Sequence, residues 1–492
     1  MPDLPVTGEA TEEIARPSKR PKADPPAHDA EANSQQTKED VGCVPTSEDC
    51  RYFDSALTTF PALYDLFEHG FLPSSVAIVG YARSNMTDEQ LRDKLRPFVE
   101  KASSDKAALE KFFERVFYRS GGYDDHEAMK AMIKDVEKWE AESATGKANR
   151  IFYFAVPPSV FLPTAAAIKD VAMSPSGWSR LIVEKPFGHD LESAKKLTDD
   201  LGALYDENYL YRIDHYLGKE MVQNLLVMRF SNTLFEPLWS RDHIASVTFT
   251  FKEDFGTEGR GGYFDSNGII RDVIQNHLMQ VFALIAMAPP VKVSGPGYSH
   301  FIRDAKVEVL QCIAPIDLNE VVLGQYVAAK DGSKPGYLDD ETVPKESVTP
   351  TFATVVLRVN NSLNKVLVVP DESTYLKTNI KAPGLRSRPI QSEMDLTYRN
   401  RYPSAYNPEA YTRLILEVLR GKQATFVRSD ELLSSWEIFT PLLKAIDSGE
   451  MGRPIPYEYG SRGPPQSDEL IERVGFKYNS NYRWSPTGNA KI

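Results

Sequence analysis

Strand-like and helix-like segments alternate over residues 60–213, and this alternation constrains the fold more than any other feature of the chain. Apolar strand-like runs lie at residues 76–79, 151–156, 181–183 and 209–213. Amphipathic helical patterns lie between them, at residues 87–100, 106–116 and 192–204. Strands that alternate with helices form parallel sheets with helical crossovers. The sequence therefore predicts an α/β nucleotide-binding domain, whose ligands gather at the carboxyl ends of the strands.

After residue 244 the pattern becomes typical of antiparallel strands. Val247, Phe249 and Phe251 alternate with polar residues, so residues 247–253 predict a strand with one apolar face. Further strands are predicted at residues 321–327, 352–359, 366–369 and 375–380, and closing helices at 408–420 and 430–446. We therefore expect a second, α+β domain with a large, mainly antiparallel sheet.

Composition excludes several classes of protein. The chain has 492 residues and a net charge of -12, which argues against nucleic acid or an acidic membrane as the main partner. Three cysteines are too few for a disulfide framework, and no apolar run reaches the length of a membrane span. Since the first residues lack the apolar core of a signal peptide, a cytoplasmic location is expected.

Four regions follow from these patterns. Residues 1–48 are rich in proline and charged residues and are predicted to be a disordered tail. We place the nucleotide-binding domain at residues 49–213 and the second domain at 214–485. Residues 486–492 form a short tail.

Residues 212–220 read RIDHYLGKE and hold the densest group of chemically active side chains. His215 and Lys219 stand four residues apart, so in a helix they would share one face of the first turn. Backbone donors and the positive end of the helix dipole would lie beside them, which suits a phosphate ester. A solvated helix start with a cap would show the same spacing.

Four further positions allow both a structural and a functional interpretation. His277 lies on the apolar face of a helix predicted over residues 269–287, where a histidine is a core residue or a buried base. Glu253 falls in the apolar phase of its predicted strand, at a strand end or lining a site. Arg83 and Lys185 each follow a strand of the predicted parallel sheet, as solvated loop cations or as ligands of a nucleotide.

Together with EKPFG at residues 184–188 and FGTEGRGGYFDSNGIIRDVIQNHLMQ at 255–280, RIDHYLGKE resembles the glucose-6-phosphate dehydrogenase family. The resemblance runs from about residue 61 to residue 484. It implies NADP-dependent oxidation of glucose 6-phosphate to 6-phosphogluconolactone, the first step of the pentose phosphate pathway. It also implies a Rossmann-like first domain, a homodimer or homotetramer, His277 as the proton acceptor and Asp214 as the carboxylate that orients it.

The same resemblance assigns the remaining site residues, and it implies no metal. The substrate would be held by Lys185, His215, Tyr216, Lys219, Glu253 and Asp272. Arg83 would bind the 2′-phosphate of NADP, and Lys185, expected before a cis proline, would touch both cofactor and sugar. A second, structural NADP would contact Tyr375, Lys377, Asp395, Thr397, Arg462, Tyr478 and Trp484.

The chain departs from the family pattern at two places. It has no glycine between Gly42 and Gly70, so the glycine-rich turn that admits a pyrophosphate is missing, and the first strand of the sheet is incomplete. After residue 361 a segment with a Gly-Lys-Ala-Leu turn is also missing. Leu367 and Val369 then stand where the family has an arginine and a glutamine.

Three interpretations therefore remain open. The chain is an active dehydrogenase, or it is an impaired homologue or splice-truncated chain that serves only as a binding or oligomer subunit. In the third interpretation the chain belongs to another oxidoreductase family that uses an EKP element beside NAD(P). This interpretation does not explain the segment RIDHYLGKE. Because a missing strand leaves apolar surface and unpaired backbone groups, we expect weak or no activity.

Overall fold

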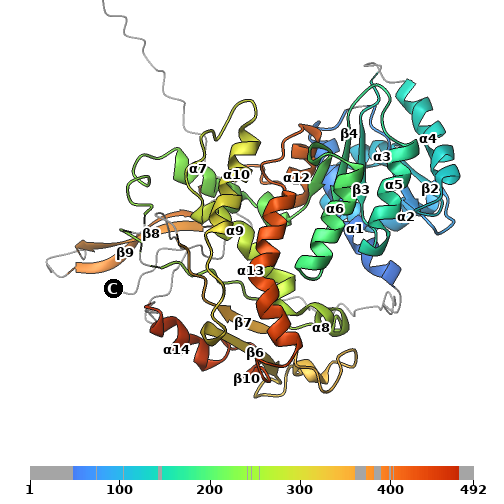
Figure 1. Ribbon diagram of the computed structural model, residues 1–492. Coiled ribbons are helices and arrows are strands. Elements are labelled where there is room, and N and C mark those ends of the chain that lie inside the picture. The colour runs from blue at the N-terminus through green and yellow to red at the C-terminus, as the bar shows by residue number, and fades with distance from the viewer. Residues whose placement is uncertain are drawn as a thin grey trace, which may run out of the picture. The chain divides into compact units, whose positions relative to one another are not determined.

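The computed structural model describes most of the chain from residue 48 to residue 475 (Figure 1). The described ranges are 48–73, 75–103, 105–141, 147–240, 242–244, 246–253, 255–360, 373–381, 389–397, 401–402 and 404–475. Both predicted tails, apart from residue 48, lie outside them, as does the strand predicted at 366–369.

Helices and strands alternate in the first half, as predicted. The elements are α1 (Glu48–Glu68), β1 (Ile78–Ala82), α2 (Asp88–Val99), α3 (Lys106–Phe113), β2 (Val116–Ser120), α4 (His126–Ala141), β3 (Arg150–Phe154), α5 (Phe161–Val171), β4 (Ser179–Val183), α6 (Leu191–Leu204) and β5 (Leu210–Arg212). Local signals explain several boundaries. Thr87 caps α2 in a capping box with Gln90, and Asp190 caps α6 in the same way with Ser193.

The strands of the first half form two separate parallel sheets among the described residues. β1 pairs with β2, and β4 pairs with β3 on one side and β5 on the other. One more parallel strand between β1 and β3 would complete the six-stranded order of the dinucleotide-binding fold, with the ligand crevice at that position. The incomplete first strand predicted from the sequence therefore corresponds to a break in the sheet.

The break affects burial. All five residues of β1 are only half-buried, whereas Leu181, Ile182 and Val183 of β4 are at most 1% exposed. A strand in the middle of a parallel sheet is buried on both faces. β1 thus has the exposure of an edge strand, although the dinucleotide-binding order would place it inside the sheet.

The second half combines helices with short strands. Its elements are η4 (His215–Gly218), α7 (Glu220–Phe230), α8 (Gly261–Ile269), η5 (Ile270–Leu278), α9 (Met279–Ala286), α10 (Tyr298–Gln311), β6 (Val321–Val327), β7 (Phe352–Val355), β8 (Ser373–Lys381), β9 (Pro389–Thr397), α12 (Ala410–Leu419), α13 (Ser429–Asp447), β10 (Ile455–Glu458) and α14 (Pro465–Arg473). The α/β half followed by an α+β half agrees with the predicted fold class.

The sheet of the second half differs from the prediction. Strand β6 pairs with β7 antiparallel and with β10 parallel, and β8 and β9 form a separate antiparallel pair. Instead of one large antiparallel sheet, the described residues form a three-stranded mixed sheet and a two-stranded one. Residues 246–253 form no strand, because they pair with no other strand among the described residues.

Several predicted boundaries need smaller corrections. The helix predicted over residues 106–116 ends at Phe113, and the next residues form strand β2, which was not predicted. The cap of α13 is Arg428, while Ser429 is the first residue of that helix. The helix predicted over 269–287 is divided into a wide, π-helical segment, η5, and a regular one, α9.

One hydrophobic core contains residues from both predicted domains. It includes Leu181 of β4, Ile285 of α9 and Trp436 of α13, and α13 packs against α6 and α10. The indole of Trp436 also donates a hydrogen bond to the Phe187 carbonyl, at 3.0 Å. α13 therefore anchors the loop after β4 to the second half of the chain.

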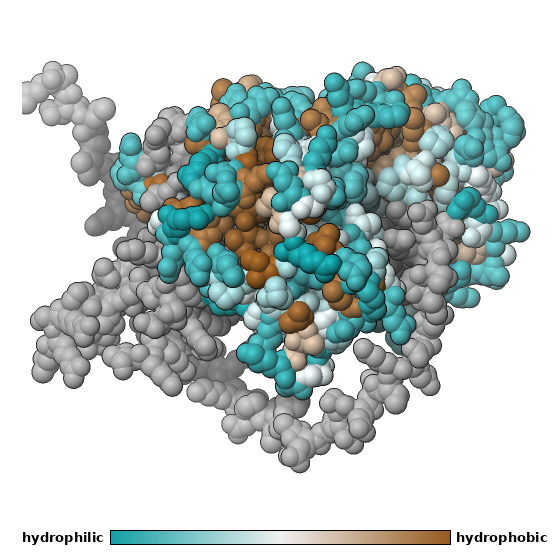
Figure 2. Space-filling model, turned by 60° about the horizontal axis from the view of Figure 1, so that its bottom comes forward, coloured by the Kyte–Doolittle hydropathy of each residue, from teal (hydrophilic) through white to brown (hydrophobic). Residues whose placement is uncertain are grey.

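Part of the surface remains apolar. Figure 2 shows apolar residues gathered among hydrophilic ones on one face of the molecule. The large side chains exposed to solvent include Val227 and Leu234, at 58% and 63% exposure. None of the helices that the structure describes has the length and apolar character needed to span a bilayer.

Candidate functional site

Asp214 and His277 come from different halves of the chain and meet in the core. Asp214 follows strand β5, and His277 lies in the wide helical segment η5. The Nδ1 atom of His277 lies 2.6 Å from Oδ1 of Asp214, and the two residues are 4% and 2% exposed. Since the carboxylate can only accept, this contact assigns the proton to Nδ1 and leaves Nε2 as the basic nitrogen.

The charge of Asp214 is stabilised despite its burial. Burial alone raises the pKa of this carboxyl. The charge of His277, the hydrogen bond that it donates and the charge of Lys185 together outweigh burial, so the pKa is lowered overall. The backbone N–H of Tyr216 also donates to Asp214, at 3.0 Å. Asp214 is therefore ionised at neutral pH and fixes the orientation of the His277 ring.

Lys185 contacts the opposite edge of that ring. It follows strand β4, and the peptide bond between Lys185 and Pro186 is cis. Its ammonium lies 2.8 Å from Nε2 of His277, 3.0 Å from the backbone oxygen of Asp272 and 3.8 Å from the Asp272 carboxylate. A substrate hydroxyl that gives its proton to Nε2 must therefore take the place of this ammonium.

The segment after Asp214 does not form the single helical turn that the spacing of His215 and Lys219 suggested. The 3₁₀ helix η4 ends at Gly218, and Lys219 has extended backbone angles before α7 begins. His215 and Lys219 therefore do not share one helical face. Instead, the Lys219 ammonium lies over the ring of Tyr216, at 3.8 Å from its centroid.

The rings of His215 and Tyr216 pack directly against His277. The Tyr216 ring stacks on His277 with centroids 4.4 Å apart, and His215 meets it edge-on at 4.6 Å. Burial lowers the pKa of His215 to about 3 and raises that of Tyr216 to about 12. Both side chains are thus uncharged at neutral pH, so the positive charge near them comes from Lys185 and Lys219.

Glu253 approaches the same group from a further segment, and Asp272 approaches it from the first turn of η5. The charge of each contributes to the raised pKa of Tyr216, which places both carboxylates in its surroundings. The ring of Phe251, in the same segment as Glu253, lies 6.2 Å from that of Tyr216. The predicted substrate residues therefore converge, although residues 246–253 lack the predicted strand.

A pocket adjoins this group. Its lining includes Lys185, Asp214, Asp272 and, at the start of the α8–η5 region, Tyr263 and Asn267. Among the described residues, no three metal-binding side chains come together.

The predicted cofactor residues lie on different sheets. Arg83 follows β1, and its guanidinium lies 5.6 Å from the ring centroid of Tyr123. Lys185 follows β4 of the three-stranded sheet. The position between the two sheets, where a glycine-rich turn would bring backbone N–H groups to a pyrophosphate, is the break described above.

The residues predicted for a structural NADP are only partly described. Tyr375 pairs with Asp395, Lys377 with Glu393 and Ser373 with Thr397, so four of the predicted residues lie along the β8–β9 ladder. The Arg462 carbonyl accepts a hydrogen bond from Lys252 at 2.9 Å. Tyr478 and Trp484 lie outside the described residues.

A second layer of side chains, which was not predicted, lies behind His215. The ring of Tyr411, from α12, is nearly parallel to that of His215, with centroids 6.0 Å apart. Beside it, the hydroxyl of Tyr153 donates to Glu184, whose pKa burial raises. The position of Glu184 next to Lys185 was the one sequence signal that could have pointed to this layer. Tyr153 and Tyr411 lie in apolar segments, where a tyrosine gives no such signal.

Comparison with known proteins identifies relatives over nearly the whole folded region. The family model described as the glucose-6-phosphate dehydrogenase NAD binding domain matches residues 55–224. The model of the C-terminal domain of the same enzyme matches residues 226–365 and 364–484.

Individual relatives and a solved structure come from the same family as the two matching family models. The chain is 48% identical to glucose-6-phosphate 1-dehydrogenase 5, cytoplasmic, of Arabidopsis thaliana, over 87% of this chain and 90% of that protein. It is 45% identical to glucose-6-phosphate 1-dehydrogenase of Takifugu rubripes, over 86% and 87%. A solved structure of glucose-6-phosphate dehydrogenase in complex with glucose 6-phosphate matches with a TM-score of 0.81 and 41% identity, covering 86% of this chain and 96% of that one.

Proposed function

The chain belongs to the glucose-6-phosphate dehydrogenase family, and we propose that it binds glucose 6-phosphate at the Asp214–His277 pair and oxidises it there. The contact between these two residues carries the proposal, because a buried carboxylate that orients an imidazole is suited to general base catalysis. Family membership confirms the resemblance found in the sequence and argues against another oxidoreductase family. The product is 6-phosphogluconolactone, and the cofactor is NADP.

The proton and the hydride leave the substrate separately. The C1 hydroxyl gives its proton to Nε2 of His277, and Asp214 stabilises the imidazolium that results. The acceptor for the hydride from C1 would be supplied by NADP, which Arg83 and Lys185 would hold. Lys185 moves from Nε2 towards the sugar as the hydroxyl arrives, so that the ammonium remains paired throughout.

We assign the substrate contacts to the converging side chains. Lys219 supplies the charge for the phosphate, and His215 and Tyr216 contribute neutral hydrogen-bond donors. Lys185, Asp272 and Glu253 hold the sugar hydroxyls. This division gives the phosphate the ammonium that lies over the Tyr216 ring, and the sugar the ammonium that lies beside His277.

The residues present fit only part of NADP. Arg83 suits the 2′-phosphate, since a cation at the carboxyl end of a strand is well placed for it, and Lys185 suits the nicotinamide side. Between Gly42 and Gly70 the sequence has no glycine that could form a turn for the pyrophosphate, and the described residues show no such turn between β1 and β3. The break between β1 and β3 therefore favours the second candidate, a chain whose activity is impaired by weak cofactor binding.

Formation of NADPH tests the proposal. Purified chain, glucose 6-phosphate and NADP should give an absorbance increase that is slower than that of an intact relative. His277→Asn should reduce it about a hundredfold or more through loss of the base. If a folded wild-type chain gives no signal, the chain is an impaired homologue that acts only as a binding or oligomer subunit.

We further propose the domain boundary at residues 213 and 214, a homodimer or homotetramer, and a cytoplasmic location. The name of the Arabidopsis relative supports the location. The β8–β9 ladder supports a structural NADP site at Tyr375, Lys377, Asp395 and Thr397. Arg462, Tyr478 and Trp484 complete that proposed site.

A further inference from the structure

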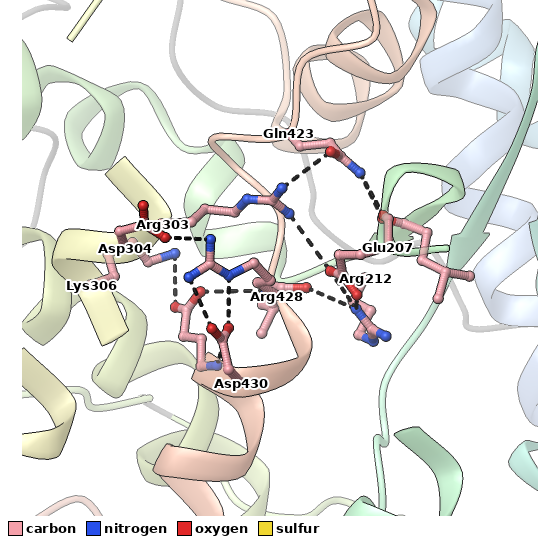
Figure 3. Close-up of polar contacts among 11 residues, drawn as sticks. Glu207, Arg212, Arg303, Asp304, Lys306, Gln423, Arg428 and Asp430 are labelled. Carbon is pink, nitrogen blue, oxygen red and sulfur yellow. Dashed lines mark hydrogen bonds and ion pairs between the residues drawn. The ribbon is translucent and has the colours of Figure 1, made fainter. Parts of the chain in front are cut away.

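A network of charged side chains, buried at its centre and partly exposed at its edge, lies between β5, α10 and the start of α13 (Figure 3). It contains four cations and four carboxylates, Arg212, Arg303, Lys306, Arg428, Glu207, Asp304, Asp430 and Glu431. The Lys306–Glu431 pair is fully buried, with 2.8 Å between Nζ and Oε1. The four positive and four negative formal charges cancel, and the Asp304 and Asp430 side chains at the edge of the network are 53% and 49% exposed.

Glu207 pairs with Arg212 and Arg303 in the part of this network that is nearest in sequence to Asp214. Both of its carboxylate oxygens accept from the Arg212 guanidinium, at 2.9 and 3.0 Å, and Arg303 lies 3.7 Å away. The amide of Gln423 donates to the backbone oxygens of Glu207 and Leu210, at 3.0 and 3.1 Å. Glu207 thus contacts β5, α10 and the loop before α13.

Arg212 is the last residue of β5 and lies two residues before Asp214. Its backbone oxygen accepts from the Val427 N–H at 3.1 Å, while its guanidinium donates to the Val427 carbonyl at 3.4 Å. The next residue, Ile213, donates to the Val183 carbonyl of β4 at 2.9 Å. The backbone that leads into Asp214 is therefore held from both sides.

We propose that Glu207 is a positioning residue that acts through Arg212 to hold the end of β5, so that the Asp214 carboxylate meets Nδ1 of His277. Hydrogen bonds of this length need side chains placed within about 0.5 Å. Without the carboxylate, the buried guanidinium of Arg212 loses its counter-charge and moves to find another. The end of the strand and Asp214 then move with it.

The chain offers a matched control in Glu140. This residue binds the buried Arg150 with both carboxylate oxygens, at 2.8 and 2.7 Å, as Glu207 binds Arg212. The arginines are 6% and 3% exposed and the carboxylates 19% and 26%. Arg150, however, begins β3, away from Asp214 in sequence and at the opposite end of the parallel sheet.

The test compares Glu207→Gln with Glu140→Gln in the full chain. For the dehydrogenation, which rests on the proposed function, Glu207→Gln should lower kcat about ten- to hundredfold with little change in KM for glucose 6-phosphate. Glu140→Gln should keep kcat within about twofold of wild type once the folded fraction is equal. Glu207→Asp, which retains the charge, should recover part of the loss.

A second measurement is independent of turnover. The proton between His277 and Asp214 should give a low-field NMR signal in the ligand-free chain, assigned by its loss in His277→Asn. Glu207→Gln should shift or broaden that signal, and Glu140→Gln should not. If the signal is unchanged in Glu207→Gln, or changes equally in both variants, the positioning role is wrong. If the wild-type chain gives the signal but no turnover, the proposed function fails and the positioning role is still tested by the signal.

Discussion

At the scale of single residues, the neutral state of His215 should be visible in the pH dependence of stability. Burial lowers its pKa from 6.5 to about 3. Between these values the unfolded chain binds a proton that the folded chain does not, so stability falls as pH drops below 6.5. The contribution of this one group is about 2 kcal/mol at pH 5.

Replacing His215 by Asn removes this proton uptake. Chemical denaturation of His215→Asn should therefore show a smaller loss of unfolding free energy from pH 7 to pH 5 than wild type, by about 1 to 2 kcal/mol. Above pH 7 the two curves should run parallel. Equal losses in both proteins would mean that His215 takes up its proton in the folded state.

At the scale of elements, the break in the parallel sheet should appear as unequal protection of strands. β4 has neighbours on both sides and side chains that are at most 1% exposed at Leu181, Ile182 and Val183. Among the strands that the structure describes, β1 pairs only with β2, and it is half-buried along its length. Hydrogen exchange should therefore be at least about tenfold slower in β4 than in β1.

Peptides covering β3 serve as an internal comparison, because β3 pairs with β4 but also borders the break. Its amides should exchange at an intermediate rate. Protection of β1 equal to that of β4 would show that another segment pairs with its open edge in solution.

Local hydrophobic patterns predicted the strands that have paired neighbours and the helices that pack with one face on the core. The strands around Leu181 and Leu210, and the helix that became α13, were found because their apolar periodicity matches their burial. The segment around Phe249 carries an equally clear alternation but forms no strand, since a strand also needs a partner. The wide turn of η5 around His277 has no sequence signal of its own.

The residues of the proposed site could be named from the sequence, but their arrangement could not. Asp214 and His277 are 63 positions apart, and only tertiary packing brings them within hydrogen-bonding distance. The contact of Lys185 with Nε2 of His277 likewise depends on how the β4 loop meets η5. The family resemblance supplied the roles, while physical patterns alone left each residue with a structural alternative.

At the scale of the whole molecule, the substrate side and the cofactor side of the site differ in completeness. The proposed substrate residues Lys185, His215 and Lys219 follow the neighbouring strands β4 and β5 of one sheet, whereas Arg83 follows β1 of a sheet that the break separates from it. Glucose 6-phosphate should therefore stabilise the chain more than NADP does at the same free concentration. A ligand at ten times its Kd adds about 1.4 kcal/mol to the free energy of unfolding.

Thermal unfolding with each ligand separately gives the comparison, with unphosphorylated glucose as the control for the phosphate contact. Lys219→Ala should weaken the effect of glucose 6-phosphate, because the charge beside the two neutral rings is then lost. It should leave the effect of NADP unchanged. If NADP alone stabilises the chain as strongly as the sugar phosphate, another segment supplies the pyrophosphate contacts, and the break in the sheet does not limit turnover.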